Sequence, residues 1–224
     1  FVETAQVYGW LPVSELAWID EAFVRSFMTG HYRTAIKDHL PVYDAAGVYR
    51  FSAGIGSMFP MLSAEGAEIL IAVADEQRQA VLTRALLPPG ASEPFPLAPT
   101  PRRLAALATE MMGQPYDWGG QFGSRDCSAT IQDLFAPFGV WLPRNSAEQA
   151  EQGLVVMLKD LSPAERELRL LAEGVPFLTL VHLPGHIMLY LGEHAGRAIV
   201  LHTLWGLRTE TPFGKEGRWS VGKK

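Results

Sequence analysis

A proline-rich stretch over residues 87–101, LPPGASEPFPLAPTP, is the sequence feature that most constrains how this chain can fold. It holds six prolines and a glycine in fifteen residues. This composition is typical of an extended, polyproline-like linker. We therefore predict that residues 88–101 link two parts of the chain.

The N-terminal part has the pattern of a small β-domain. Short β-prone runs with glycines between them occur at residues 48–51, 58–62 and 68–74. Residues 14–29 instead carry apolar side chains three and four positions apart, which predicts a helix. Short strands separated by turn residues are typical of half-open β-barrels. We predict such a barrel over residues 31–87, and the end of a preceding domain or an inter-domain segment over residues 1–30.

In the C-terminal part, residues 102–224, the sequence pattern predicts helices first and strands afterwards. Helices are predicted to begin at Thr100-Pro101, near Cys127, at Ser146 and at Ser162, the last two in the capping boxes SAEQ and SPAE. Strands are predicted over residues 177–183, 187–191 and 197–203. Helices and strands that are segregated along the chain indicate an α+β domain.

Composition and charge exclude several classes of protein. Apolar residues make up 48% of the chain and charged residues 19%, which favours a packed core over disorder. The net charge of −5 gives no reason to expect nucleic acid as a partner. No apolar stretch approaches the roughly 18 residues of a transmembrane segment. The chain begins at Phe1 without an initiator methionine, which indicates a mature or trimmed chain whose missing signal peptide assigns no compartment.

Cys127 is the only cysteine, so neither an internal disulfide nor a multi-cysteine zinc site can form. It stands in SRDCS, after a glycine-rich loop and directly before a predicted amphipathic helix. The first turn of a helix offers free N–H groups and the positive end of the helix dipole, which stabilise a thiolate and a developing oxyanion. The alternative for a lone cysteine is a small buried side chain. The position of Cys127 favours a nucleophile.

A thiolate nucleophile needs a base, and the base needs a group that orients it. His186 stands at the start of a nearly continuous apolar strand, and His202 ends the next predicted strand. Facing side chains of neighbouring antiparallel strands lie within about 5.5 Å, so His202 can hydrogen-bond His186. Cys127, His186 and His202 thus supply nucleophile, base and orienting group. His182 and His194 are interpreted as ordinary strand residues.

Four motifs occur in a fixed order in the C-terminal part. They are PYDWGG at residues 115–120, DCS at 126–128, LPRNSAEQ at 142–149 and GHIMLYLG at 185–192. Together they resemble the NlpC-type cell-wall cysteine peptidases over roughly residues 100–215. Upstream, GWLP at residues 9–12 and IGSMFP at 55–60 resemble the bacterial SH3-like domains that precede the peptidase in one branch of this family. The resemblance implies a papain-like α+β peptidase domain after SH3-like β-barrel material.

The resemblance also implies an activity and roles for particular residues. The reaction is cleavage of the γ-D-glutamyl to diamino-acid bond in peptidoglycan stem peptides or their fragments. Cys127 is the nucleophile, His186 the base and then the acid, and His202 the orienting residue. Tyr116 lies beside the thiol and holds the substrate or the oxyanion. Asp126 binds a free N-terminal ammonium, and the pocket residues Ser128, Arg144 and Ser146 meet the D-glutamate carboxylate, as charge pairing favours.

Each pocket residue has a simpler alternative. Asp126 can be just the N-cap of the following helix, and Ser146 can likewise be a cap. Arg144 can be a solvated loop residue, and Tyr116 with Trp118 can be core aromatics. The first SH3-like domain, which supplies part of the amine site in relatives, is expected to be truncated here. The need for a free N-terminal alanine therefore stays open.

Two other classes of function compete with hydrolysis. One is a wall-binding protein whose SH3-like domain grips peptidoglycan while the peptidase fold is inert. The other is an acyltransferase or amidase, because one acyl-thioenzyme serves water, amines or thiols as acceptors. The resemblance implies peptidoglycan stem peptides or muropeptide fragments as partners, with no metal or organic cofactor. We also expect a monomer. The substrate favours the periplasm or cell envelope, with the cytoplasm as the alternative.

Overall fold

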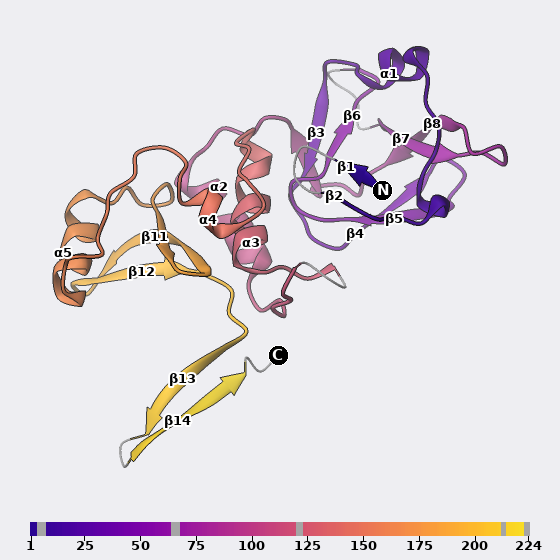
Figure 1. The fold of residues 1–224 in the computed structure, drawn as a ribbon. Helices are drawn as coiled ribbons and strands as arrows, with labels where there is room; N and C mark the ends of the chain where they lie inside the picture. The colour runs from indigo at the N-terminus through magenta and orange to yellow at the C-terminus, as the bar shows by residue number, and fades with distance from the viewer. Residues whose placement is uncertain (4–7, 64–67, 120–122, 212–213, 222–224) are drawn as a thin grey trace. The chain divides into compact units, whose positions relative to one another are not determined.

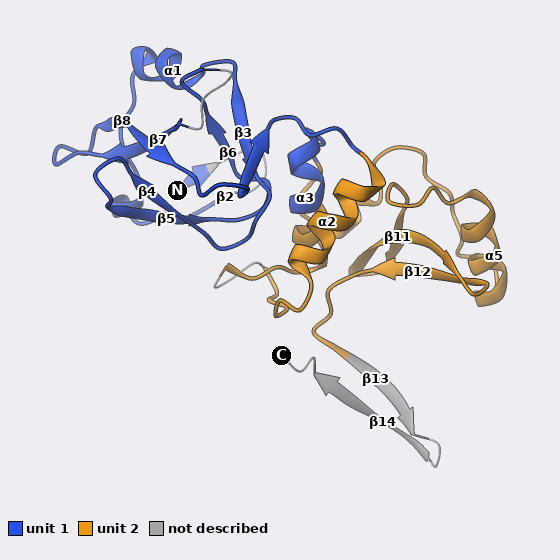
Figure 2. Ribbon diagram, turned by 180° about the vertical axis from the view of Figure 1, so that it is seen from behind, with its two compact units in different colours: residues 1–99, 133–141 blue, residues 100–132, 142–224 orange. Residues whose placement is uncertain are grey.

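The structure is a computed structural model that describes residues 1–3, 8–63, 68–119, 123–211 and 214–221 (Figure 1). It divides into two compact units (Figure 2). Unit 1 consists of residues 1–99 and 133–141, and unit 2 of residues 100–132 and 142–224. Within the described ranges, no helix is both long enough and apolar enough to cross a membrane.

The elements of unit 1 are mostly short strands. They are β1 (Val2–Glu3), β2 (Tyr8–Gly9), η1 (Val13–Glu15), α1 (Glu21–Phe27), β3 (Tyr32–Ala35), β4 (Leu40–Asp44), β5 (Tyr49–Ala53), β6 (Met58–Pro60), β7 (Glu68–Ala74), β8 (Ala80–Leu86), β9 (Ser92–Pro94) and η3 (Ala136–Phe138). The two main sheets have the strand orders β6-β3-β9 and β5-β4-β8-β7, and every pairing in them is antiparallel.

The core of unit 1 follows from the two-residue period of its strands. In β4 the residues are alternately buried and exposed, so Leu40 and Val42 point inward while Tyr43 stays at the surface. Ile69 and Ile71 of β7 join the same apolar cluster. The predicted β-rich domain is therefore present, with its strands closing around one small core.

Two predictions for this part of the chain differ from the structure. The helix predicted over residues 14–29 is shorter, because the side chain of Asp20 accepts the backbone N–H of Phe23 at 2.7 Å and caps α1 at Glu21. The proline-rich stretch predicted as a linker contains β9, which pairs with β3. Arg33 fixes this pairing by donating to the side-chain and backbone oxygens of Ser92 at 2.9 and 2.8 Å. An edge strand tolerates prolines that a central strand would exclude.

Unit 2 holds helices and a separate antiparallel sheet. Its elements are α2 (Pro101–Met111), most of α3 (Cys127–Phe135), α4 (Ser146–Gln149), α5 (Pro163–Glu173), β10 (Leu180–Leu183), β11 (His186–His194), β12 (Arg197–Leu201), β13 (Gly206–Thr211) and β14 (Gly214–Val221). Strands β10, β11 and β12 form a sheet in that order, and β13 pairs with β14. This is the α+β organisation that the sequence predicts.

The predicted helix starts in unit 2 are confirmed with one exception. Thr100 caps α2 with Pro101 in its first turn, and Ser162 with Glu165 forms the predicted capping box of α5. For α4, however, the cap is Asn145, whose side-chain oxygen accepts the backbone N–H of Glu148 at 2.9 Å. Ser146 is thus the first residue of the helix rather than its cap.

The boundary between the two units passes through α3, because residues 133–135 cluster with unit 1. In unit 1, Gly56 lies directly against the end of this helix. Gly56 has a φ of +85°, and a Cβ added to it would come within 2.8 Å of the Ala136 Cβ and 3.2 Å of the Asp133 carbonyl oxygen. Only glycine fits both this backbone conformation and this close approach.

Gly56→Ala should therefore lower the free energy of unfolding by more than the strain of placing alanine at a positive φ accounts for. Gly47→Ala is a matched control, because Gly47 has a φ of +78° and no heavy atom within 4 Å of the added Cβ. We expect the control to lose about 1–2 kcal/mol from backbone strain and Gly56→Ala about 1–3 kcal/mol more from overpacking. Denaturant titration measures both, and equal losses would contradict the close approach.

Candidate active site

Cys127 is the first residue of α3 and is only 6% exposed. The helix starts there because Asp126 supplies the cap: its Oδ1 accepts the Ala129 N–H at 2.8 Å, and its carbonyl accepts the Thr130 N–H at 3.0 Å. The predicted helix start near Cys127 is confirmed. The sulfur is thus carried on the first turn of a helix, where the dipole favours a negative charge.

His186 and His202 are joined by a hydrogen bond, with 2.9 Å between the Nε2 of His186 and the Nδ1 of His202. The strand register explains the contact: Leu189 pairs with Leu201, so His202, just beyond β12, lies diagonally across from His186 at the start of β11. Diagonal neighbours on one face of a sheet are within reach of long or aromatic side chains. The expected contact between the two imidazoles is therefore present.

A hydroxyl pair ties the sheet to the helix that carries the cysteine. The Oγ1 atoms of Thr130 and Thr203 are 3.2 Å apart. Thr130 lies one turn after Cys127 and is buried, and Thr203 directly follows His202. This bond sets the position of the segment that holds His202 relative to the helix that holds Cys127, and residue types alone gave no signal for it.

Asp126 and Arg144 form a bidentate ion pair beside the cysteine. Nη1 of Arg144 donates to Oδ1 of Asp126 at 3.0 Å, and Nη2 donates to Oδ2 at 2.8 Å. Ser128 belongs to the same cluster: its hydroxyl donates to Oδ1 of Asp126 at 3.1 Å and accepts from Nη1 of Arg144 at 3.1 Å. Three of the predicted pocket residues are thus in direct contact. Arg144 is not a freely solvated loop residue.

The loop that carries Arg144 is held by two buried glutamines. The Nε2 of Gln149 donates to the backbone oxygens of Pro143 and Ser128, at 2.8 and 2.9 Å. The Nε2 of Gln132 donates to the backbone oxygen of Leu142 at 2.8 Å. These side chains fix the loop against α3, so the guanidinium of Arg144 is positioned from both sides. Gln149 is the last residue of the LPRNSAEQ motif, which could have marked it as a candidate.

Tyr116 lies on the loop before the cysteine, and its position is fixed by pairing with Arg125 through a parallel β-bridge. Arg125 is buried, and its Nη1 donates to the Gln114 side chain at 2.8 Å. Burial first, and then the electrostatic influence of the neighbouring Cys127 and Asp126 side chains, raise the pKa of Tyr116, so its phenol stays a hydrogen-bond donor at neutral pH. Trp118 is 75% exposed and is not a core aromatic.

The ionisable groups of the site are shifted in ways that suit its chemistry. Burial raises the pKa of Asp126, but its hydrogen bonds from Arg144 and Ala129 outweigh this effect and hold the pKa below its ordinary value. Burial lowers the pKa of His186, and the nearby His202 and His182 lower it further. Burial also lowers the pKa of His202. The carboxylate therefore stays charged at neutral pH, and both imidazoles are biased towards the neutral form.

The remaining predicted residue, Ser146, lies at the start of α4 and is partly exposed. Within the described part of the chain, no side-chain hydrogen bond joins it to Asp126 or Arg144, so its place in a pocket stays a prediction. No group of three or more histidine, cysteine, aspartate or glutamate side chains in the described ranges could hold a metal ion.

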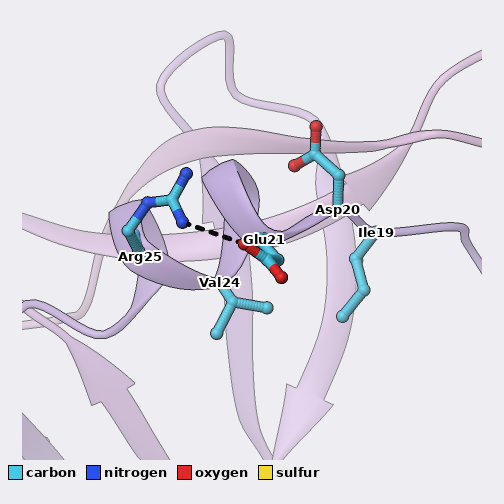
Figure 3. Close-up of a pocket in the computed structure, with 5 residues that line it drawn as sticks. All are labelled: Ile19, Asp20, Glu21, Val24 and Arg25. Atoms are coloured by element: carbon cyan, nitrogen blue, oxygen red, sulfur yellow. Dashed lines mark hydrogen bonds and ion pairs between the residues drawn. The ribbon is translucent and has the colours of Figure 1, made fainter.

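A surface pocket of about 500 Å³ lies in unit 1, at α1 (Figure 3). Its lining residues are Ile19, Asp20, Glu21, Val24 and Arg25. The charged members are already engaged, since Asp20 caps α1 and Arg25 pairs with Glu21 at 3.3 Å. This pocket contains none of the predicted site residues, all of which belong to unit 2.

Helices that lead into an antiparallel sheet, with a cysteine at a helix start and a histidine pair on the sheet, define unit 2 as a papain-like domain. Residues 113–208 match the NlpC/P60 family, and residues 20–65 match the SH3 domain of SH3b2 type. The chain therefore carries an NlpC/P60 domain preceded by an SH3b2-type SH3 domain, as the sequence motifs predict.

Solved structures resemble this chain in fold. An NlpC/P60 endopeptidase from Photobacterium damselae subsp. piscicida superposes with a TM-score of 0.78 at 27% identity, over 96% of this chain and 50% of that one. An NlpC/P60 family protein from Bacillus cereus ATCC 10987 has a TM-score of 0.51 at 15% identity, over 89% of this chain and 65% of that one. The second likeness concerns the fold alone.

Curated relatives are similar over the peptidase part. A γ-D-glutamyl-L-lysine dipeptidyl-peptidase of Bacillus subtilis (strain 168) is 32% identical over 113 residues, which are 47% of this chain and 35% of the relative. A probable endopeptidase of Mycobacterium tuberculosis is 32% identical over 87 residues, or 38% of this chain and 20% of the relative. The chain thus spans about a third or less of these relatives.

The lowered pKa of His186 predicts where activity is lost in acid. For the role of general base that the sequence predicts, His186 must be neutral, and its lowered pKa keeps it neutral further into acid. The pH at which kcat/KM declines on the acid side should therefore lie below 6.5. A pH–rate profile of peptide hydrolysis measures this decline, and a decline at or above pH 6.5 would contradict the predicted role.

Proposed function

We propose that this protein is a cysteine peptidase that hydrolyses the γ-D-glutamyl to diamino-acid bond of peptidoglycan stem peptides or their fragments. The observation that carries the proposal is the arrangement of Cys127 at a helix start and a hydrogen-bonded His186–His202 pair in the same unit. The similarity to a γ-D-glutamyl-L-lysine dipeptidyl-peptidase supports this choice of bond.

The hydrogen bond between the histidines allows a tautomer in which His186 can act as the base. If the Nδ1 of His202 is the acceptor, the Nε2–H of His186 is the donor, and the Nδ1 of His186 carries the free lone pair. His202 then holds the ring of His186 in one orientation. In this scheme the Nδ1 of His186 takes the proton of the Cys127 thiol.

The reaction then proceeds through an acyl-thioenzyme. The Cys127 sulfur attacks the γ-carbonyl carbon, and the amide C–N bond breaks as the imidazolium of His186 gives its proton to the leaving amine. Water, deprotonated by His186, next attacks the thioester, which releases the γ-D-glutamyl acid and restores the thiol. Tyr116, which keeps its phenolic proton, is proposed to donate to the substrate or the oxyanion.

The substrate pocket is proposed to include Ser128, Arg144 and Ser146, facing the D-glutamate α-carboxylate. Arg144 is already held in place by Asp126, which supports a preorganised anion contact. We further propose that the SH3-like domain covers residues 31–87 and the peptidase domain residues 102–224. Action on cell-wall material in the periplasm or envelope, by a monomer, completes the proposal.

Purified protein incubated with L-Ala-γ-D-Glu-L-Lys should release L-Ala-γ-D-Glu and lysine, as measured by mass spectrometry. Cys127→Ala should lose activity by at least about a thousandfold, because the nucleophile is removed. Thr179→Ser is a conservative control in unit 2 that keeps its hydroxyl and should retain activity. Full cleavage by Cys127→Ala would contradict the proposal, and transfer of the acyl group to an added amine in place of water would assign an acyltransferase.

A further inference from the structure

Two threonine hydroxyls join α3 to the segment that follows β12. The Oγ1 atoms of Thr130 and Thr203 are 3.2 Å apart, and Thr130 is only 2% exposed. Thr130 lies one turn after Cys127, and Thr203 directly follows His202. The bond therefore connects the helix that carries the candidate nucleophile with the segment that carries the candidate orienting residue.

The direction of this hydrogen bond follows from the number of hydroxyl protons. The Thr130 hydroxyl donates to the backbone oxygen of Asp126 at 2.9 Å. A threonine hydroxyl has one proton to donate and two acceptor sites, so Thr130 accepts the proton of Thr203. The result is an ordered chain that runs from Thr203 through Thr130 to the cap of α3. Valine in place of Thr203 would remove the donor of this chain and keep nearly the same shape.

The segment that holds His202 needs such an anchor, because His202 lies beyond the last residue pair of the β11–β12 ladder. His202 does bond His186, with 2.9 Å between the two ring nitrogens. A hydrogen bond within the histidine pair, however, does not by itself fix the pair relative to α3. The bond between Thr203 and Thr130 supplies that connection.

We propose that Thr130 and Thr203 are positioning residues of the candidate site. Their hydrogen bond holds the histidine pair at α3, where His186 can take the proton of the Cys127 thiol. The inference deepens the proposed function and rests on the roles proposed there for Cys127 and His186. Neither threonine is assigned a contact with the substrate, so both act through the histidines.

The alternative is that Thr130 only bonds the turn of its own helix. Threonines inside helices commonly donate to the carbonyl four residues earlier. Thr109 of α2 does so, since its hydroxyl donates to the Ala105 oxygen at 2.7 Å. Thr109 is exposed, whereas Thr130 is buried and also accepts a hydroxyl from a separate segment. Thr109→Val is therefore a matched control for the loss of a helical threonine hydroxyl.

The first test measures the rate at which iodoacetamide alkylates the single cysteine at about pH 6, and it needs no substrate. Thr203→Val should react at least about threefold more slowly than wild type, because a displaced imidazole activates the thiol less. Thr203→Ser keeps the hydroxyl and should stay within about twofold of wild type. Thr109→Val should react like wild type. A smaller loss in Thr203→Val, or an equal loss in Thr203→Ser, would overturn the proposal.

His186→Gln in the same assay distinguishes the failure of this inference from the failure of the proposed function. If His186→Gln reacts as fast as wild type, the roles proposed for His186 and Cys127 are wrong, and the positioning role is wrong with them. If His186→Gln is slow while Thr203→Val stays fast, only the positioning role is wrong.

Steady-state kinetics with L-Ala-γ-D-Glu-L-Lys give a second readout. Thr203→Val should lower kcat by at least about fivefold and change KM by less than about twofold, because the threonines do not touch the substrate. A rise in KM with an unchanged kcat would place Thr203 in the substrate site and would overturn the positioning role.

A double variant separates positioning from stability. Thr130→Val alone leaves the Thr203 hydroxyl without its acceptor, whereas Thr130→Val combined with Thr203→Val brings two apolar side chains together. The double variant should therefore recover part of the Tm that Thr130→Val loses. Its alkylation rate should stay as low as that of Thr203→Val, because the hydrogen bond is still missing. Recovery of the alkylation rate together with the Tm would show that packing suffices and would overturn the proposal.

Discussion

The carboxylate of Asp126 is the group on which the candidate site of unit 2 depends. It caps α3, so that the helix begins at Cys127. It holds the loop of Arg144 through two parallel hydrogen bonds. It also anchors the glycine-rich loop through the Gly119 N–H. One buried charge therefore sets the relative positions of three segments of unit 2, and burial of that charge is tolerated because its partners satisfy it.

The two histidines of the site are positioned by strand pairing rather than by capping and charge. His186 and His202 are brought together by the register of β11 and β12, which follows from burial of Ile187, Leu189 and their neighbours on one face. The Thr130–Thr203 bond then ties this sheet to α3. The geometry of the two histidines thus comes from core packing, whereas that of the cysteine comes from capping and charge. The proposed chemistry requires both.

The sequence was most informative where local chemistry fixes the structure. The start of α3 at Cys127 and the capping box of α5 depend on a few adjacent residues, and the pairing of His186 with His202 depends on two neighbouring strands. These features could be predicted from motifs and spacing. The SH3b2-type and NlpC/P60 domains could be predicted for the same reason.

Predictions failed where a distant partner decides the outcome. The proline-rich stretch could not be recognised as containing β9, because its partners, β3 and Arg33, lie about sixty positions away. The Asp126–Arg144 pair was likewise not predicted, because the sequence does not show that the loop of Arg144 returns to the start of α3. Asn145 replaced Ser146 as the cap of α4 because both types are good caps and only the backbone conformation distinguishes them.

The central claim is that His186 activates Cys127, and the rate of thiol alkylation tests it most directly. Because the chain has a single cysteine, the rate of reaction with iodoacetamide reports Cys127 alone. At about pH 6, where an unassisted thiol is almost entirely protonated, wild type should react at least about tenfold faster than His186→Gln. Equal rates for the two proteins would show that the imidazole does not act on the thiol and would contradict the account.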